Sequence, residues 1–168
     1  KQPTKKQLAA FCSGFTGLLR GPCWNEGWPL YKDEILTAQG LDAYCGSLFL
    51  TATADRERCY GALFYVVTAQ LGLDVSDVAT FCSGLNSVPH QASCYANGAG
   101  RMIETDYRNI PSALKLCSDA SANLKEACFS ELVKDASYDF PPGSPDAARL
   151  CAGMPEPWQS KCESVIGK

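Results

Sequence analysis

Ten cysteines in a chain of 168 residues constrain this protein more than any other feature of its sequence. The chain has one histidine and no Cys-x-x-Cys pair, which argues against a zinc set, a haem-attachment motif or a redox pair. An even number of cysteines at this density is typical of a disulfide framework, which forms in oxidising compartments. We therefore expect an extracytoplasmic location: secreted, periplasmic or at the cell surface.

The cysteines fall into five pairs with a regular spacing. Within a pair 10 to 13 residues intervene, and the first cysteines of successive pairs lie 33 to 37 residues apart. A period of this length is typical of repeat proteins built from units of two helices. The pairs are Cys12/Cys23, Cys45/Cys59, Cys82/Cys94, Cys117/Cys128 and Cys151/Cys162.

The residues beside the cysteines follow the same register. A large apolar residue precedes every first cysteine: Phe11, Tyr44, Phe81, Leu116 and Leu150. An aromatic residue follows four of the second cysteines, namely Trp24, Tyr60, Tyr95 and Phe129, whereas Glu163 follows the fifth. This agreement at several positions indicates an internal repeat.

Each unit has the pattern of two helices joined by a tight turn. Leu8, Phe11 and Cys12 share one helical face, at spacings of three and four residues. Helix N-caps are expected at Ser76-Asp77, Ser112 and Ser144-Pro145-Asp146, and second helices over 58–71 and 125–133. Antiparallel helices place the two cysteines opposite each other beside the turn, at a Cα separation of about 5.5–6 Å that suits a disulfide. The predicted bonds are therefore the five local pairs.

These observations predict an all-α fold: a single repeat domain over residues 1–168 with about five helix-turn-helix units, each closed by a disulfide. The units are expected at approximately 7–36, 37–73, 74–110, 111–143 and 144–168. Residues 1–6 are expected to form a mobile basic tail, in a mature chain from which a signal or anchor has been removed.

The period, the paired helices and the cysteine placement resemble those of the disulfide-stapled helical repeat proteins of the Sel1-like and tetratricopeptide type. The resemblance covers most of the chain but concerns architecture, because the Trp-Leu-Gly-Tyr pattern of tetratricopeptide units is missing. It implies a right-handed array with a binding surface for proteins or peptides.

Candidate catalytic residues are few. His90 follows a proline in the turn of the third unit, where we expect it to be solvated. Because two carboxylates suffice for glycoside hydrolysis, Glu26, near two tryptophans, and Glu104 are the candidates for a secreted glycan hydrolase. Gly98 and Gly100 lack the third glycine of a dinucleotide fingerprint, so we expect them to allow close helix packing.

Three aromatic residues of the first unit, Trp24, Trp28 and Tyr31, are the candidates for partner binding. Tryptophan and tyrosine dominate binding hot spots, and a terminal unit has one neighbour missing. The alternative is that these side chains close the end of the core as a cap. Trp158, in the last unit, is open to the same two interpretations.

Composition excludes several classes of function. A net charge of −3 provides no basic field for nucleic acid, and the longest apolar run, residues 62–67, is too short to span a membrane. No cofactor or metal is expected. The favoured hypothesis is a non-enzymatic protein-binding or structural subunit of a larger assembly, whose partner is another protein. A third hypothesis is a small apolar ligand carrier, with Leu63, Phe64 and Val67 lining its cavity.

Overall fold

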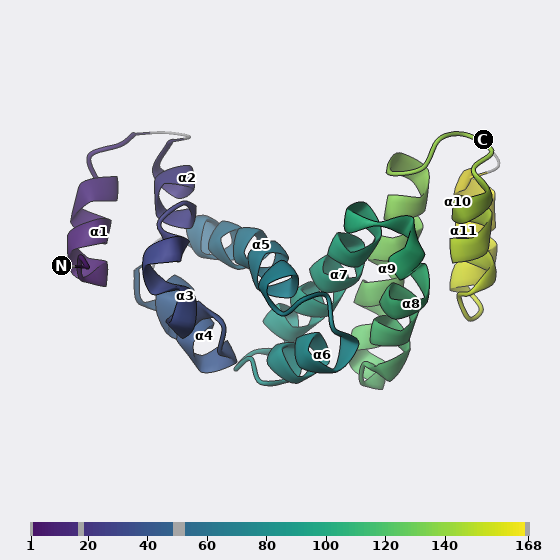
Figure 1. Ribbon diagram of the computed structural model, residues 1–168, viewed down its shortest axis with the longest axis horizontal. Helices are drawn as coiled ribbons and strands as arrows, with labels where there is room; N and C mark the ends of the chain where they lie inside the picture. Colours follow the sequence, from purple (N-terminus) through teal and green to yellow (C-terminus); the bar gives the residue numbers. More distant parts are fainter. Residues whose placement is uncertain (1, 17–18, 49–52, 167–168) are drawn as a thin grey trace.

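The computed structural model describes residues 2–16, 19–48 and 53–166, and every regular element in these ranges is a helix (Figure 1). The expected all-α class is thus confirmed. The first half contains α1 (Lys5–Cys12), α2 (Arg20–Asn25), the 3-10 helix η2 (Trp28–Tyr31), α3 (Lys32–Ile35), α4 (Ala38–Leu48) and α5 (Thr53–Gln70). The second half contains α6 (Val75–Ser83), α7 (Val88–Thr105), the 3-10 helix η3 (Tyr107–Asn109), α8 (Ile110–Asp119), α9 (Ala122–Tyr138), α10 (Pro145–Ala152) and α11 (Trp158–Ile166).

The helices form an arch with the two chain ends at opposite ends (Figure 1). Helices α1 to α4 make one arm, α5 to α7 the base, and α8 to α11 the other arm. Helix α7 packs between α5 and α9, and α9 also contacts α11, while α8 contacts both α6 and α10. Helix α1 contacts α2 and α4 and is the outermost helix of its arm.

Several helices begin where a polar side chain satisfies the free backbone N–H groups. Thr4 forms a capping box with Gln7, so α1 begins at Lys5 and includes the last two residues of the predicted tail. Ser144 caps α10 as expected. The expected caps at Ser76-Asp77 and Ser112 are wrong: Asp74 caps α6, and α8 begins at residue 110, after Asn109.

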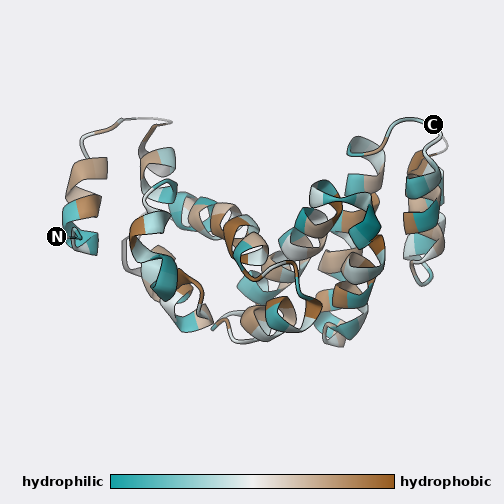
Figure 2. Cartoon of the chain, in the orientation of Figure 1, coloured by the Kyte–Doolittle hydropathy of each residue, from teal (hydrophilic) through white to brown (hydrophobic). Residues whose placement is uncertain are grey.

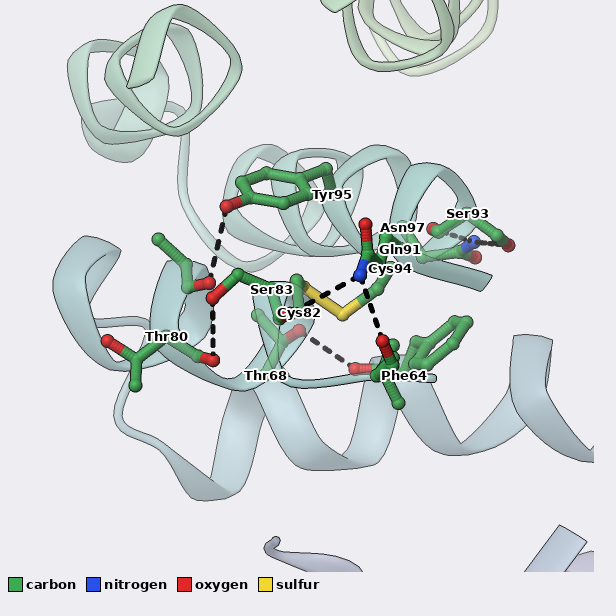
Figure 3. Close-up of a disulfide and its surroundings, with 12 residues drawn as sticks. Phe64, Thr68, Thr80, Cys82, Ser83, Gln91, Ser93, Cys94, Tyr95 and Asn97 are labelled. Carbon is green, nitrogen blue, oxygen red and sulfur yellow. Dashed lines mark hydrogen bonds between the residues drawn. A yellow bond between two sulfur atoms is a disulfide. The ribbon is translucent and has the colours of Figure 1, made fainter. Parts of the chain in front are cut away.

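Five disulfides are present, and each joins the two cysteines of one local pair. They are Cys12–Cys23, Cys45–Cys59, Cys82–Cys94, Cys117–Cys128 and Cys151–Cys162, with Cα separations from 5.3 to 5.7 Å. Each links the C-terminal part of one helix to the next α-helix along the chain. Figure 3 shows the third bond, beside which the Gln91 amide donates hydrogen bonds to the carbonyls of Ser83 (3.3 Å) and Leu85 (2.9 Å). This pair of contacts closes the turn between α6 and α7.

One continuous core runs from α1 to α11. Figure 2 shows apolar and polar residues interleaved along the helices, as expected of amphipathic helices that bury one face. The glycine of α7 at position 98 allows close packing, because a Cβ there would lie 3.1 Å from Val78 and 3.3 Å from Leu116. The expected packing role of Gly98 is thus confirmed.

Candidate functional site

The predicted aromatic binding cluster lies largely in the core. Trp24 is 1% exposed and stacks on Tyr44 with ring centroids 4.5 Å apart, and Tyr31 is also buried. The Tyr31 hydroxyl donates a hydrogen bond to the backbone oxygen of Pro3 (2.7 Å). Trp28 is partly buried against the same core. Of the two interpretations of these residues, the cap on the core therefore holds for Trp24 and Tyr31, and the exposed patch does not.

Other residues of the first helix pair expose apolar surface. Phe11 is 67% exposed and Leu19 is 63% exposed. Phe15 is also exposed and meets the Phe11 ring edge-on, with centroids 5.6 Å apart. We call Phe11, Gly14, Phe15 and Leu19 the N-terminal end face. Phe11 lies in the last turn of α1, and the other three lie between α1 and α2, the first two helices of this arm (Figure 1). Exposed aromatic side chains grouped in this way are typical of interaction surfaces.

A cluster of carboxylates lies where α7 packs on α9, beside α5. Glu104 accepts a hydrogen bond from the Tyr65 hydroxyl, and the Arg101 guanidinium lies over the Tyr65 ring, 5.4 Å from its centroid. Asp135 is 9% exposed and faces Gly100, where a Cβ would lie only 2.9 Å from Asp135 Oδ2. Gly100 thus makes room for a buried carboxyl group.

Burial raises the pKa of two carboxyl groups in this region, Asp135 and Asp139. It raises the pKa of Asp135 to about 7, and the neighbouring carboxylates Glu131, Asp139 and Glu104 add to the effect, while Lys134 opposes it. The pKa of Asp139 is raised in the same direction, again mainly by burial. Asp135 Oδ2 accepts no hydrogen bond from any described residue. The cluster therefore holds one carboxyl group that is half-protonated near neutral pH.

The chemistry open to this cluster is limited by access. Glu104 and Asp139 line a cavity of about 390 Å³ together with Tyr107, but Asp135 does not line it. A general acid must come within hydrogen-bond distance of its substrate. In this arrangement the group with the most perturbed pKa is shielded from the cavity, whereas Asp139, whose pKa is also raised, lines the cavity together with Glu104. Glu26, the other hydrolase candidate, is exposed just after α2.

His90 is not the solvated turn residue that its sequence context predicts. It lies in the first turn of α7, and its ring stacks on Tyr60 with centroids 3.7 Å apart. Its Nε2 lies 3.2 Å from Glu57, and the Tyr60 hydroxyl donates to Asp42 at 2.8 Å. The side chain is covered because α7 packs on α5, so His90 joins two successive helix pairs.

The residues named for an apolar ligand cavity belong to the core. Leu63, Phe64 and Val67 are buried on α5 within the continuous core. Across the described ranges, no group of histidine, cysteine and acidic side chains has the arrangement of a metal site. In the same ranges, no helix combines the length and apolar character needed to span a membrane.

Sequence reasoning missed Asp135 and Leu19, although signals for both exist. Glu131, Asp135 and Asp139 follow each other at intervals of four residues, which places like charges on one helical face. Leu19 lies four residues before Cys23. This position becomes a signal only when the residues at the same distance from the second cysteine are compared in all five pairs. Comparison with protein-family models, with curated proteins and with solved structures found no match to this chain.

Proposed function

We propose that this chain is a non-enzymatic, protein-binding or structural subunit of an extracytoplasmic assembly. In this proposal it is a rigid array of five helix pairs, each closed by its own disulfide, and another protein binds to its exposed end. The three parts of the proposal, namely the array, the compartment and the binding surface, rest on different observations.

Contacts that recur between successive helix pairs support the array. His90 lies four residues before Cys94 and stacks on Tyr60 of the preceding pair. Trp158 lies four residues before Cys162 and stacks on Phe129 of the preceding pair, with centroids 4.9 Å apart. In both cases the ring that receives the contact directly follows the second cysteine of its own pair. The same positions thus make the same contact in different parts of the chain.

The disulfides support the oxidising compartment. All ten cysteines are bonded, and their bonds close loops with sequence separations of 11 to 14 residues. In the chain-entropy model each such loop contributes up to about 3 kcal/mol to the free energy of unfolding. A fold made of short helix pairs that depends on these bonds is suited to secreted or periplasmic conditions, because cytosolic thiols are kept reduced.

The N-terminal end face is the single observation that carries the protein-binding role. Elsewhere in the described ranges the exposed large hydrophobic side chains, Leu30, Val88 and Tyr138, lie on three different elements or connections. At the end face Phe11 and Leu19 are both more than half exposed, and Phe15 is beside Phe11. Burial of such side chains in a partner contributes about 1.5–3 kcal/mol for each.

Native mass spectrometry of the protein isolated under mild conditions from its source tests this proposal. We expect a particle that is heavier than the 18.1 kDa chain and contains at least one other polypeptide. A bare chain at physiological concentration, with no other polypeptide after mild crosslinking of the source material, would contradict the subunit role.

A glycan hydrolase is a second candidate, favoured by the cavity that Glu104 and Asp139 line together, where burial raises the pKa of Asp139. The matched test compares Glu104→Gln with Glu26→Gln in a glycan-cleavage screen. Activity that is abolished by one substitution and retained by the other would establish the hydrolase and displace the subunit proposal.

A further inference from the structure

The N-terminal end face occupies positions that, in several of the later helix pairs, contact the pair before them. Three positions show this. They are the residue directly before the first cysteine, the second residue after the first cysteine, and the fourth residue before the second cysteine. In the first pair they are Phe11, Gly14 and Leu19.

The residue before the first cysteine is buried in every pair except the first. Its relative exposure is 0% for Tyr44, Leu116 and Leu150 and 6% for Phe81, against 67% for Phe11. Tyr44 shows what covers this position: its ring stacks on Trp24, a residue of the preceding pair. Phe11 is therefore a large apolar side chain at a position that is buried in the later pairs, but no preceding helix pair buries it in the described structure.

The residue four before the second cysteine is stacked or buried in three of the four later pairs, and in the second pair it is Asp55, which is partly exposed and forms an ion pair with Arg58. His90 and Trp158 each stack on an aromatic ring of the preceding pair, and Leu124 is buried. Leu19, the equivalent in the first pair, is 63% exposed. In the third and fifth pairs, the residue four before the second cysteine therefore contacts an aromatic ring of the preceding pair.

The position two after the first cysteine is a glycine in three pairs. A Cβ at Gly84 would lie 3.0 Å from Ala38, and one at Gly153 would collide with Leu114, each in the first helix of the preceding pair. The glycines therefore allow two first helices to approach closely. At Gly14 only the Phe11 backbone oxygen, of the same turn, lies within 4 Å among the described residues. This glycine leaves room that no described helix uses.

The opposite end of the arch does not provide the complementary surface. The residue that directly follows the second cysteine of the last pair is Glu163, which is exposed and charged, where the other pairs have aromatic rings. The rings at Tyr60 and Phe129 are already stacked, and Trp24 and Tyr95 are buried. A second copy that stacked head to tail would place Leu19 on a carboxylate. Continuation of the array by a second copy is therefore disfavoured, which favours a different chain as the occupant of the end face.

We propose that the N-terminal end face docks a helix pair of a different protein, which presents an aromatic ring to Leu19 and an aliphatic side chain of a neighbouring helix to Gly14. This inference rests on the proposed function and names its binding surface. Docking continues the contact that links successive pairs inside the chain, so Phe11 enters the partner as Tyr44 enters the pair before it. The partner is recognised by apolar shape and ring stacking.

The test uses the full chain and the partner polypeptide recovered from the native particle. A double variant, Phe11→Glu with Leu19→Glu, is expected to bind that partner about 100-fold more weakly or worse, because two charges replace the anchors. The matched control is Val88→Glu with Tyr138→Glu, which changes two other large hydrophobic residues that are more than half exposed. It is expected to leave the affinity within about twofold. Unfolding curves of both variants in isolation confirm that each is folded.

A photoreactive phenylalanine analogue at position 11 then identifies the contact. Crosslinks to a helix of the partner, next to an aromatic residue, support the inference. Crosslinks to a second copy of this chain, or equal affinity of the double variant and the control, overturn it while the partner in the particle still supports the proposed function. A particle without any partner overturns the proposed function itself, and this result is separable because it appears before any variant is made.

Discussion

Replacing Asp135 by asparagine tests the account of the buried carboxylate. Burial raises the pKa of Asp135 from its ordinary value of 3.8 to about 7, so the folded protein holds its proton more tightly than the unfolded chain. Between about pH 4 and pH 7 the folded state binds more protons, and the free energy of unfolding must therefore fall as the pH rises. The raised pKa is thus a cost to stability that is absent at acidic pH and fully present above neutral pH.

The magnitude follows from the difference between the two pKa values. One pKa unit corresponds to about 1.4 kcal/mol, so the ionised carboxylate costs up to about 4 kcal/mol above pH 7. Asp135→Asn removes the charge at constant shape. We expect the variant to be more stable than the parent by about 2–4 kcal/mol at pH 8 and equal to it near pH 4.

Urea unfolding of the disulfide-intact protein at pH 4.5, 6 and 8 measures this difference. Asp33→Asn, at an exposed site, is the matched control and is expected to change the free energy of unfolding by less than about 0.5 kcal/mol at each pH. A difference between Asp135→Asn and the parent that does not change from pH 4.5 to pH 8 would refute the assignment of a raised pKa to this group.

Two further predictions concern packing. Gly100→Ala is expected to lower the free energy of unfolding by about 1–3 kcal/mol, since its methyl group would collide with a carboxyl oxygen 2.9 Å away. In contrast, Gly61 lies in the middle of α5, and a Cβ there would have no atom within 4 Å. Gly61→Ala should therefore raise the free energy of unfolding by about 0.5–1 kcal/mol. The same change in stability for both substitutions would contradict the packing of α7 on α9. Phe11→Ala should change the stability of the isolated chain by less than about 0.5 kcal/mol, whereas Leu150→Ala, at the equivalent buried position, should cost about 2–5 kcal/mol. Chemical denaturation checks both substitutions, and a large loss for Phe11→Ala would mean that this side chain is covered in the isolated chain.

The helical class and the helix pairs could be predicted because cysteine spacing and apolar periodicity are local signals. Helix starts were harder to predict. The second helix of the second pair was expected to begin at residue 58, but α5 begins at Thr53. Its first turns include the exposed residues Glu57 and Arg58. A helical turn that is exposed and polar has no regular spacing of apolar residues. The apolar periodicity of α5 is therefore visible only from the point where the helix enters the core. Asp74 was overlooked as a cap because Ser76 and Asp77 have the same side-chain preference.

The exposure of individual side chains depends on neighbours that the sequence does not identify. Trp24 and Phe11 both flank cysteines, but Trp24 is covered by Tyr44 from the next pair, whereas Phe11 is exposed. His90 is covered for the same reason, by a ring 30 residues earlier in the chain. The acidic stripe of α9 can be read in the sequence, but the burial of Asp135 depends on a glycine of α7. Such contacts between pairs become apparent only when the pairs are placed side by side.

The central claim is that each helix pair is closed on itself by a disulfide in an oxidising compartment. The most direct test is to isolate the protein from its source with free thiols blocked, and to map the bonds by mass spectrometry of a non-reduced digest. The account predicts a mass about 10 Da below that of the reduced chain, no blocked thiol, and five crosslinked peptides whose cysteines lie 11 to 14 residues apart. A blocked cysteine, or a bond between cysteines of different pairs, would contradict the closed helix pair and with it the proposed compartment.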